Sequence, residues 1–429
     1  MLYSVHKPIF FLFFLLVILP TPSQAVFGDG PESGKTSTLK EIIVEGNTRT
    51  DLQLILNEMG LEIGQAFDRE LMNKIWIMLE DIGYFAFVDM EYEDLGSDGV
   101  ILNVSVEEDM TMAYGPLVRY SRRQKYLIGA WFEEQNLRGK GEKLSIDLAG
   151  LFIQRGEISW TKPWLAGVQG LKMKLSALGE NSNFVFRPTR QKIGWGELEI
   201  RWNFMGDFYV AGNLNYGQTQ FADSYYWADP VTGNPVLHQA GTVAHLATGG
   251  LLGYDSRDNP WYPSGGLFAE AGARHWASDD FTSYTEATAN LSAFIPVPLG
   301  KHVLALHAWG RRTDGPSHLE NNLFFGGPET IRGYQFAGLE GDEGYLLSAE
   351  YRIPLFMMPI SAKGEMVGVG LHLFGDAGDA WHDGLDPGRA VQSWGGGLHL
   401  NIDKVQLRFE GAKTSEGDWV FEFMDQFNF

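Results

Sequence analysis

The segment GGPETIRGY at residues 326–334 places one arginine, Arg332, among glycines. Glycine adopts backbone angles that other residues resist, so this segment can fold back on itself. The runs on either side alternate apolar and polar residues, as membrane-barrel strands do. A loop of this kind can carry Arg332 into a barrel interior, where a charge must find an opposite partner.

The elements that would position this loop are short alternating strands separated by Gly, Asp, Asn and Pro. Sixteen candidates can be counted, an even number, as bacterial membrane barrels require. They start near Thr111, Tyr126, Glu142, Arg155, Leu171, Lys192, Asp207, His245, Gly266, Tyr284, His302, Gly344, Val367, Ser393, Val405 and Trp419. Residues 111–429 are therefore predicted to form a transmembrane β-barrel of 16 antiparallel strands.

The last candidate strand shows the alternation most clearly. Its aromatic residues can face lipid while the residues between them face a wet lumen, although a soluble sandwich would alternate too. The aromatic set is Trp419, Phe421, Phe423, Phe427 and Phe429, and the other set is Val420, Glu422, Met424, Gln426 and Asn428. If the first strand starts in the periplasm, Arg332 lies in the sixth outer connection. The Asp-, Asn- and Pro-rich segment 254–263 is then a tight periplasmic turn.

The N-terminus resembles a secretory signal peptide over residues 1–25. Lys7 gives the positive start, residues 9–19 are apolar, and Ser23-Gln24-Ala25 offers a small-residue cleavage site. A retained membrane anchor is the alternative interpretation. Residues 26–38 are rich in Gly, Ser, Pro and Thr and are predicted to be a flexible lead-in.

Residues 39–110 are predicted to form a small α+β module of the order strand, helix, helix, strand, strand (βααββ). Thr50 is a candidate helix cap, with Gln53 completing a capping box, and Asp68 is the cap candidate of the second helix. Gly60 and Gly83 are placed to end the two helices. The predicted apolar stripes are Leu52, Ile55, Leu56 and Met59 on the first helix, and Leu71, Ile75, Met78, Leu79 and Ile82 on the second.

Several motifs together resemble a known family. The Ile42-to-Asn47 start, the GYF at residues 83–85 and the closing strand resemble a polypeptide-transport-associated (POTRA) domain. Residues 326–334, the turn at 254–265 and FGDAGDAW at 374–381 add a resemblance to the BamA/TamA-type assembly and translocation proteins, or bacterial surface antigens. The resemblance implies the outer membrane as location, with the POTRA domain in the periplasm.

The resemblance also implies a partner for the loop arginine, which in such proteins meets acids on the next two strands. Glu350 and Asp376 match the family's acid positions, and each lies on the polar face of its candidate strand. We predict a loop lock in which Arg332, followed by Gly333 and Tyr334, pairs with Glu350, Asp376 or both. Two interpretations of this contact stay open: it only pins the loop and supports folding of the barrel, or it supports the working state of an insertase.

A second implied site is the seam between the first and last strands, where the family is thought to open. Gly115 and Pro116 weaken the first strand, because proline lacks a ladder donor and glycine packs no side chain. In the last strand, which ends at Phe429, Asp425 interrupts the aromatic face. Ordinary fraying of a strand start is the alternative reading.

Composition narrows the classes of function. The net charge of -21 argues against a nucleic-acid binder, and the absence of cysteine removes thiolate chemistry. No Gly-x-Ser-x-Gly or His-Glu-x-x-His motif is present, and His372 is interpreted as a lumen-facing polar residue, so no enzyme, metal or cofactor is predicted. The family implies polypeptide clients, lipid and possible periplasmic or lipoprotein partners. A solute pore is the competing class, and the single POTRA domain puts a general, essential assembly role in doubt.

Overall fold

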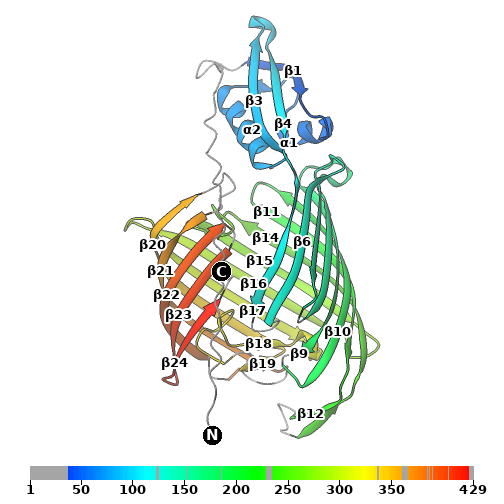
Figure 1. The fold of residues 1–429 in the computed structure, drawn as a ribbon, viewed down its shortest axis with the longest axis vertical. Coiled ribbons are helices and arrows are strands. Elements are labelled where there is room, and N and C mark those ends of the chain that lie inside the picture. The colour runs from blue at the N-terminus through cyan, green and yellow to red at the C-terminus, as the bar shows by residue number, and fades with distance from the viewer. Residues whose placement is uncertain are drawn as a thin grey trace.

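The computed structural model describes residues 37–121, 125–151, 153–184, 186–228, 234–335, 338–359, 366–383, 385, 387–388, 390–403 and 405–424. The predicted signal peptide, residues 26–36 of the lead-in, and the seam residues Asp425 and Phe429 lie outside these ranges. The described residues form a small N-terminal module and a large curved sheet (Figure 1).

The module is a sheet of order β2-β1-β4-β3 covered by two helices. Its elements are β1 (Ser37–Glu45), α1 (Leu52–Met59), β2 (Ala66–Phe67), α2 (Arg69–Asp81), β3 (Phe85–Asp94), the 3-10 turn η1 (Gly96–Asp98) and β4 (Val100–Glu108). β1 and β4 are parallel, and the alternating apolar residues of β3 and β4 pack against the helices. This is the predicted βααββ order with the short edge strand β2 added.

One predicted helix cap is wrong. The side chain of Asp51, not Thr50, caps α1 by accepting a hydrogen bond from the Gln53 amide at 2.8 Å. Thr50 is buried, and its amide donates to the carboxylate of Glu108. Burial favours the neutral form of Glu108, but the hydrogen bonds from Thr50 outweigh it and lower the pKa of this carboxyl.

The capping box predicted at Gln53 is also wrong, because the Gln53 side chain donates to Asn57 Oδ1 at 2.8 Å. The cap of the second helix and the glycine that ends the first are confirmed, and the apolar stripes are rotated slightly. Asp68 caps α2 through the Leu71 amide at 2.8 Å, and Gly60 ends α1 in the left-handed region. Leu52 is 46% exposed, while its neighbour Leu54, absent from the predicted stripe, is buried. Met78 of α2 is likewise exposed, at 37%, and lies outside the core cluster of the module.

The second sheet contains 16 strands over the described part of residues 112–424, and each ladder joins antiparallel neighbours. The strands are β5 (Met112–Ser121), β6 (Lys125–Leu137), β7 (Glu142–Ala149), β8 (Gln154–Lys162), β9 (Leu171–Phe184), β10 (Thr189–Phe204), β11 (Phe208–Phe221), β14 (Gly241–Asp255), β15 (Gly266–Ala277), β16 (Tyr284–Val297), β17 (His302–Asp314), β20 (Glu343–Pro359), β21 (Met366–Trp381), β22 (Val391–Asp403), β23 (Val405–Thr414) and β24 (Trp419–Met424). The predicted number and order of strands are confirmed.

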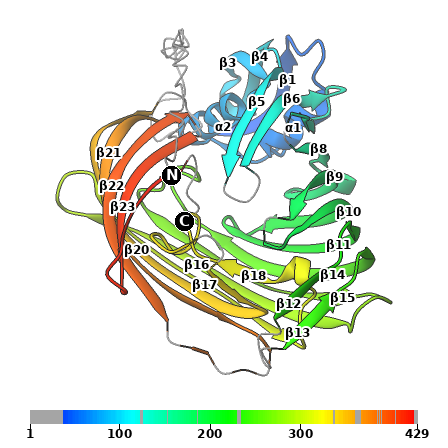
Figure 2. The same cartoon turned by 60° about the horizontal axis from the view of Figure 1, so that its bottom comes forward.

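The sheet curves round until its two terminal strands, β5 and β24, approach the same side of the cylinder (Figure 2). No ladder joins β5 to β24 within the described residues. Along β24, Trp419, Phe421 and Phe423 are exposed on the outer face, whereas Glu422 and Met424 are buried on the inner face, as the alternation predicts.

The module lies at one end of the cylinder, and the connection that holds Arg332 lies at the other (Figure 1). Arg332 is in the connection from β17 to β20, the sixth on the end away from the module. This connection contains the 3-10 turn η3 (Leu319–Asn321) and the hairpin of β18 (Leu323–Phe325) and β19 (Leu339–Gly341). Among the helices described, none is long and apolar enough to cross a bilayer.

Candidate functional site

The segment that carries Arg332 is a compact turn. The Gly327 amide donates to the Ile331 carbonyl at 3.1 Å, and the Thr330 amide donates back to the Gly327 carbonyl at 3.1 Å. Gly326 adopts a φ of +113° and its amide donates to Thr330 Oγ1 at 2.8 Å. These short-range bonds satisfy the turn internally, so the loop can leave solvent without stranding its backbone groups.

The guanidinium of Arg332 is completely buried inside the cylinder. Its Nε and Nη2 donate to the two oxygens of Asp376 at 2.7 Å each, and Nη1 donates to Glu350 Oε2 at 2.9 Å. Nη2 also reaches Ser348 Oγ at 3.1 Å, and the Phe374 ring lies 3.6 Å from the guanidinium carbon. The fork geometry of arginine matches a carboxylate, which makes this the stronger class of hydrogen bond.

Strand register explains why the two acids lie together. In the β20–β21 ladder, Ser348 is opposite Asp376 and Glu350 is opposite Phe374. Side chains two residues apart on a strand share a face, so all four point inward. Both acids named by the sequence analysis therefore contact Arg332.

The other two residues of the predicted lock lie next to this cluster. The Gly333 amide donates to Glu422 Oε2 at 3.0 Å, and a Cβ at Gly333 would stand only 2.8 Å from the Cβ of Ala412. The Tyr334 hydroxyl lies 3.0 Å from the Gln392 carbonyl, outside the charge cluster. Gly333 therefore permits close approach to β23, while Tyr334 anchors the loop near the outer ends of the strands.

Sequence reasoning missed half of the buried cluster. Glu410 accepts from Arg332 at 3.5 Å and from Arg408 at 2.7 Å, and Arg408 and Arg352 both donate to Glu350. Three guanidinium groups thus pair with three carboxylates inside the wall. A signal was present, because Arg408 and Glu410 alternate with the lipid-facing Phe409 and must share the inner face.

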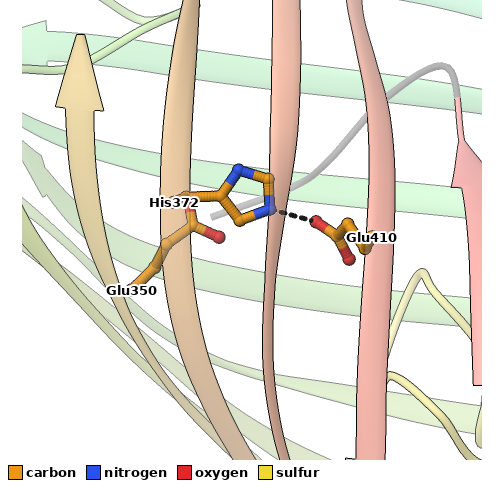
Figure 3. A group of neighbouring side chains, drawn as sticks. All are labelled: Glu350, His372 and Glu410. Atoms are coloured by element: carbon orange, nitrogen blue, oxygen red, sulfur yellow. Dashed lines mark hydrogen bonds and ion pairs between the residues drawn. The ribbon is translucent and has the colours of Figure 1, made fainter. Parts of the chain in front are cut away.

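Glu350, His372 and Glu410 offer ligand atoms within 4.8 Å of one another, as a metal site would (Figure 3). His372 Nε2 lies 2.8 Å from Glu410 Oε1, and no ion is needed to explain that contact. The same carboxylates already bind arginine side chains, whose positive charges oppose a cation. We interpret the trio as part of the ion-pair cluster.

The base of the outer loop is held by a separate contact. Asp342 accepts from the Ser317 amide at 2.8 Å and lies 3.1 Å from His382 Nδ1. Burial favours neutral Asp342, but its hydrogen bonds, led by that from His382, outweigh burial and lower the pKa of the carboxyl. The same bond to Asp342 raises the pKa of His382.

The predicted seam residues are only partly described. Gly115 and Pro116 lie in β5, opposite Trp131 and Ala130 of β6. A Cβ at Gly115 would be 3.1 Å from the Trp131 indole nitrogen, so this glycine makes room for the ring. Asp425 and Phe429 lie outside the described residues, and the role of the seam stays a prediction.

The module docks on two turns of the wall. Asn136, buried at the end of β6, donates to Thr50 Oγ1 at 2.9 Å, and the Asp51 amide donates to the Gly139 carbonyl at 2.8 Å. On the next turn, Trp164 donates to Glu58 of α1 at 2.6 Å. Sequence reasoning missed this interface, because its partners lie about a hundred residues apart in the chain.

Two family models match the chain. The Omp85 superfamily domain matches residues 136–424, and the POTRA model, described as a surface antigen variable number repeat, matches residues 37–109. A curated relative is the outer membrane protein assembly factor BamA of Neisseria meningitidis serogroup B, which is 23% identical over 428 residues. That match covers 90% of this chain and 52% of the relative, so the chain spans about half the relative's length.

Solved structures share the fold. BamA from Haemophilus ducreyi lacking POTRA domains 1-3 aligns with a TM-score of 0.68 and 16% identity, over 90% of this chain and 84% of that one. CdiB from Acinetobacter baumannii aligns with a TM-score of 0.61 and 12% identity, over 91% and 73%. CdiB from Escherichia coli aligns at 0.55 and 12%, over 95% and 92%.

Proposed function

The chain belongs to the Omp85 superfamily, and on that premise we propose that it assists the insertion, assembly or translocation of polypeptides at the outer membrane. The protein lies in the outer membrane with its N-terminal POTRA module in the periplasm. The proposed role is not enzymatic. Its partners would be membrane lipid and unfolded or exported polypeptides, with periplasmic or lipoprotein partners as a further part of the proposal.

The first step of the proposed mechanism is capture of a client strand by the module. β3 is an edge strand, since its ladder runs to β4 alone within the described sheet. An edge strand presents unpaired backbone donors and acceptors that an extended peptide can join. Phe87 on this strand is 46% exposed and could contact an apolar client side chain.

The second step is handover at the seam of the wall. β5, the first strand of the wall, contains Pro116, which offers no ladder donor. Each of these strands has one ladder partner among the residues described. The position of β5 and β24 at the two ends of the strand order is the observation that carries the proposal, because the edge of a sheet can template a client strand.

The third element is the loop lock, which holds the wall beside the seam. Arg332 ties the outer loop to β20, β21 and β23, and Gly333 ties it to Glu422 of β24 itself. A buried pair of this kind contributes little net stability but is costly to break on one side. The lock would therefore keep the terminal strands in one arrangement while a client is engaged.

Reconstitution tests the proposed function. Protein in liposomes should increase the rate at which an unfolded β-barrel client becomes heat-modifiable, relative to protein-free liposomes. A disulfide between cysteines introduced in β5 and β24 should abolish the gain, and a reductant should restore it; the chain has no native cysteine to interfere.

The outcomes separate the parts of the mechanism. Absence of any acceleration would contradict the assembly role. A normal rate with the seam locked would remove lateral opening alone. Steady conductance in a planar bilayer without an effect on clients would favour the solute pore, for which a wall of this size has room.

A further inference from the structure

Part of the periplasmic turn between β14 and β15 is buried: Asn259, Tyr262 and Pro263 leave solvent, while Trp261 stays 51% exposed. Asn259 Oδ1 accepts from the amides of Trp261 and Tyr262 at 2.8 and 3.2 Å, and the Asp258 amide donates to the Gly265 carbonyl at 3.1 Å. These local bonds fix the backbone of the turn. The Tyr262 side chain is buried as a result.

A chain of polar contacts leads from Tyr262 to the loop arginine. The Tyr262 hydroxyl lies 3.0 Å from His399 Nε2, and the two Nδ1 atoms of His399 and His372 are 3.1 Å apart. His372 Nε2 lies 2.8 Å from Glu410 Oε1, which accepts from Arg332. The turn from the periplasmic end and the loop from the outer end thus meet in one buried network.

One proton arrangement satisfies every contact with both rings neutral. Ionised Glu410 only accepts, so His372 carries its proton on Nε2 and accepts at Nδ1. His399 then donates from Nδ1 and accepts at Nε2, which leaves the Tyr262 hydroxyl as the donor. Burial raises the pKa of Tyr262 to about 12, so this phenol keeps the proton that it donates.

A second branch runs in parallel. The Pro263 carbonyl accepts from Arg352 at 3.5 Å, and Arg352 Nε donates to Glu350 Oε1 at 2.9 Å. The other oxygen of Glu350 binds Arg332 at 2.9 Å. Tyr262 is therefore linked to Glu410, and Pro263 to Glu350. These are the two acids that Nη1 of Arg332 contacts.

The wall leaves space for this network. A Cβ at Gly370 would stand 2.3 Å from His399 Nε2, so any larger residue there would displace the imidazole from Tyr262. Gly370 is opposite His399 in the β21–β22 ladder, and His399 is opposite Arg408 in the next. Register alone thus stacks these side chains beside the ion-pair cluster.

We propose that the periplasmic turn and the outer loop are the two ends of one lumenal latch, with Tyr262 and His399 as positioning residues for Arg332. Buried polar networks of this kind act cooperatively, and coupling between two sites is reciprocal. Loosening the turn loosens the loop, and releasing the loop loosens the turn. This coupling goes beyond the proposed function, because it requires no client.

Hydrogen exchange of the full-length protein in liposomes tests the latch. Tyr262→Phe removes one hydroxyl, and exchange of the amides at 331–334 should rise about five-fold, the change expected from losing one buried hydrogen bond. Arg332→Lys should raise exchange at 259–264 in return. Tyr254→Phe, the same substitution at the periplasmic end of β14, lies outside the network and should change neither segment.

Each outcome decides the matter. A distant rise in both variants, with the control unchanged, supports the latch. Exchange that rises only near each substitution, or at a distance in one variant alone, overturns it, because coupling must act in both directions. If Tyr262→Phe does not fold, Arg332→Lys decides alone: a rise in exchange at 259–264 supports the latch, and an unchanged rate there overturns it.

Discussion

The ion pairs at the two ends of the curved sheet differ in their exposure to solvent. On the inner face of β20–β23, the side chains of Glu350 and Glu410, and that of the loop residue Arg332 which they contact, are at most 1% exposed. In β6 and β7, Lys143 pairs with Glu133 at 2.8 Å and at side-chain exposures of 47% and 26%. Solvent screens the second kind of pair, so its strength is about 0–1 kcal/mol, whereas breaking a buried pair costs about 3–5 kcal/mol.

The difference in charge burial matches the part of the protein that each end of the sheet binds. The C-terminal strands bind the outer loop through charges that no water reaches. The N-terminal strands bind the module through their periplasmic turns, by Asn136, Gly139 and Trp164. One end of the wall therefore fixes a loop inside the lumen, and the other fixes a domain outside it.

The largest expected effect comes from Arg332→Ala. It leaves Asp376, Glu350 and Glu410 with fewer counter-charges in a buried site and should lower the free energy of unfolding by about 3–5 kcal/mol. The temperature at which heat-modifiability is lost in detergent measures this. Lys143→Ala, which removes the solvent-exposed pair with Glu133, is the control, with an expected loss below about 1 kcal/mol. Equal losses of unfolding free energy in the two variants would contradict the proposed difference between the two ends of the sheet.

A smaller effect is expected from Gly139→Ala at the module interface. Gly139 has a φ of +72°, and a Cβ there would stand 1.9 Å from the Arg49 carbonyl oxygen. Strain of about 1–3 kcal/mol should loosen docking and broaden the distance distribution between spin labels at Ile63 and Leu299. Gly206→Ala is the control, since its φ is +76° and nothing lies within 4 Å of the new Cβ. An unchanged distribution in Gly139→Ala would show that the turn does not hold the module.

The smallest effect is a pH dependence at the base of the outer loop. The pKa of His382 is raised by Asp342, so the stabilisation is complete below about pH 6.5 and fades as the pH rises through the folded pKa. The pKa of Asp342 is lowered, so its contribution is present above about pH 4 and fades as the pH falls through its folded value. The free energy of unfolding of wild type should therefore exceed that of His382→Gln at pH 6 by about 1 kcal/mol or less, and the two should converge at pH 9. The unfolding temperatures of the two proteins at each pH measure this. A difference that does not change with pH would exclude the ionic contact.

The sequence alone predicts the strands of the 16-stranded sheet and part of the site around Arg332. Alternation fixed which residues of β20 and β21 face inward, so Glu350 and Asp376 were identifiable as inward-facing acids. Alternation also marked Arg408 as inward-facing, but which residues of β22 and β23 meet Glu350 and His372 depends on cross-strand register, which no local pattern encodes, so the contacts of His399 and Arg408 went unrecognised. The inward fold of Tyr262 was hidden for a related reason, since turn residues predict a bend but not its direction.

The most direct test of the account is a disulfide between Gly333→Cys and Ala412→Cys. The Cβ atoms at these positions are 2.8 Å apart before relaxation, close enough to bridge after a small shift. The account predicts that the cross-link forms in the membrane-inserted protein, while Gly333→Cys paired with Leu299→Cys in the turn between β16 and β17 stays reduced. Free thiols at 333 and 412, both labelled by a membrane-impermeant maleimide in the folded protein, would show that the loop does not lie in the lumen.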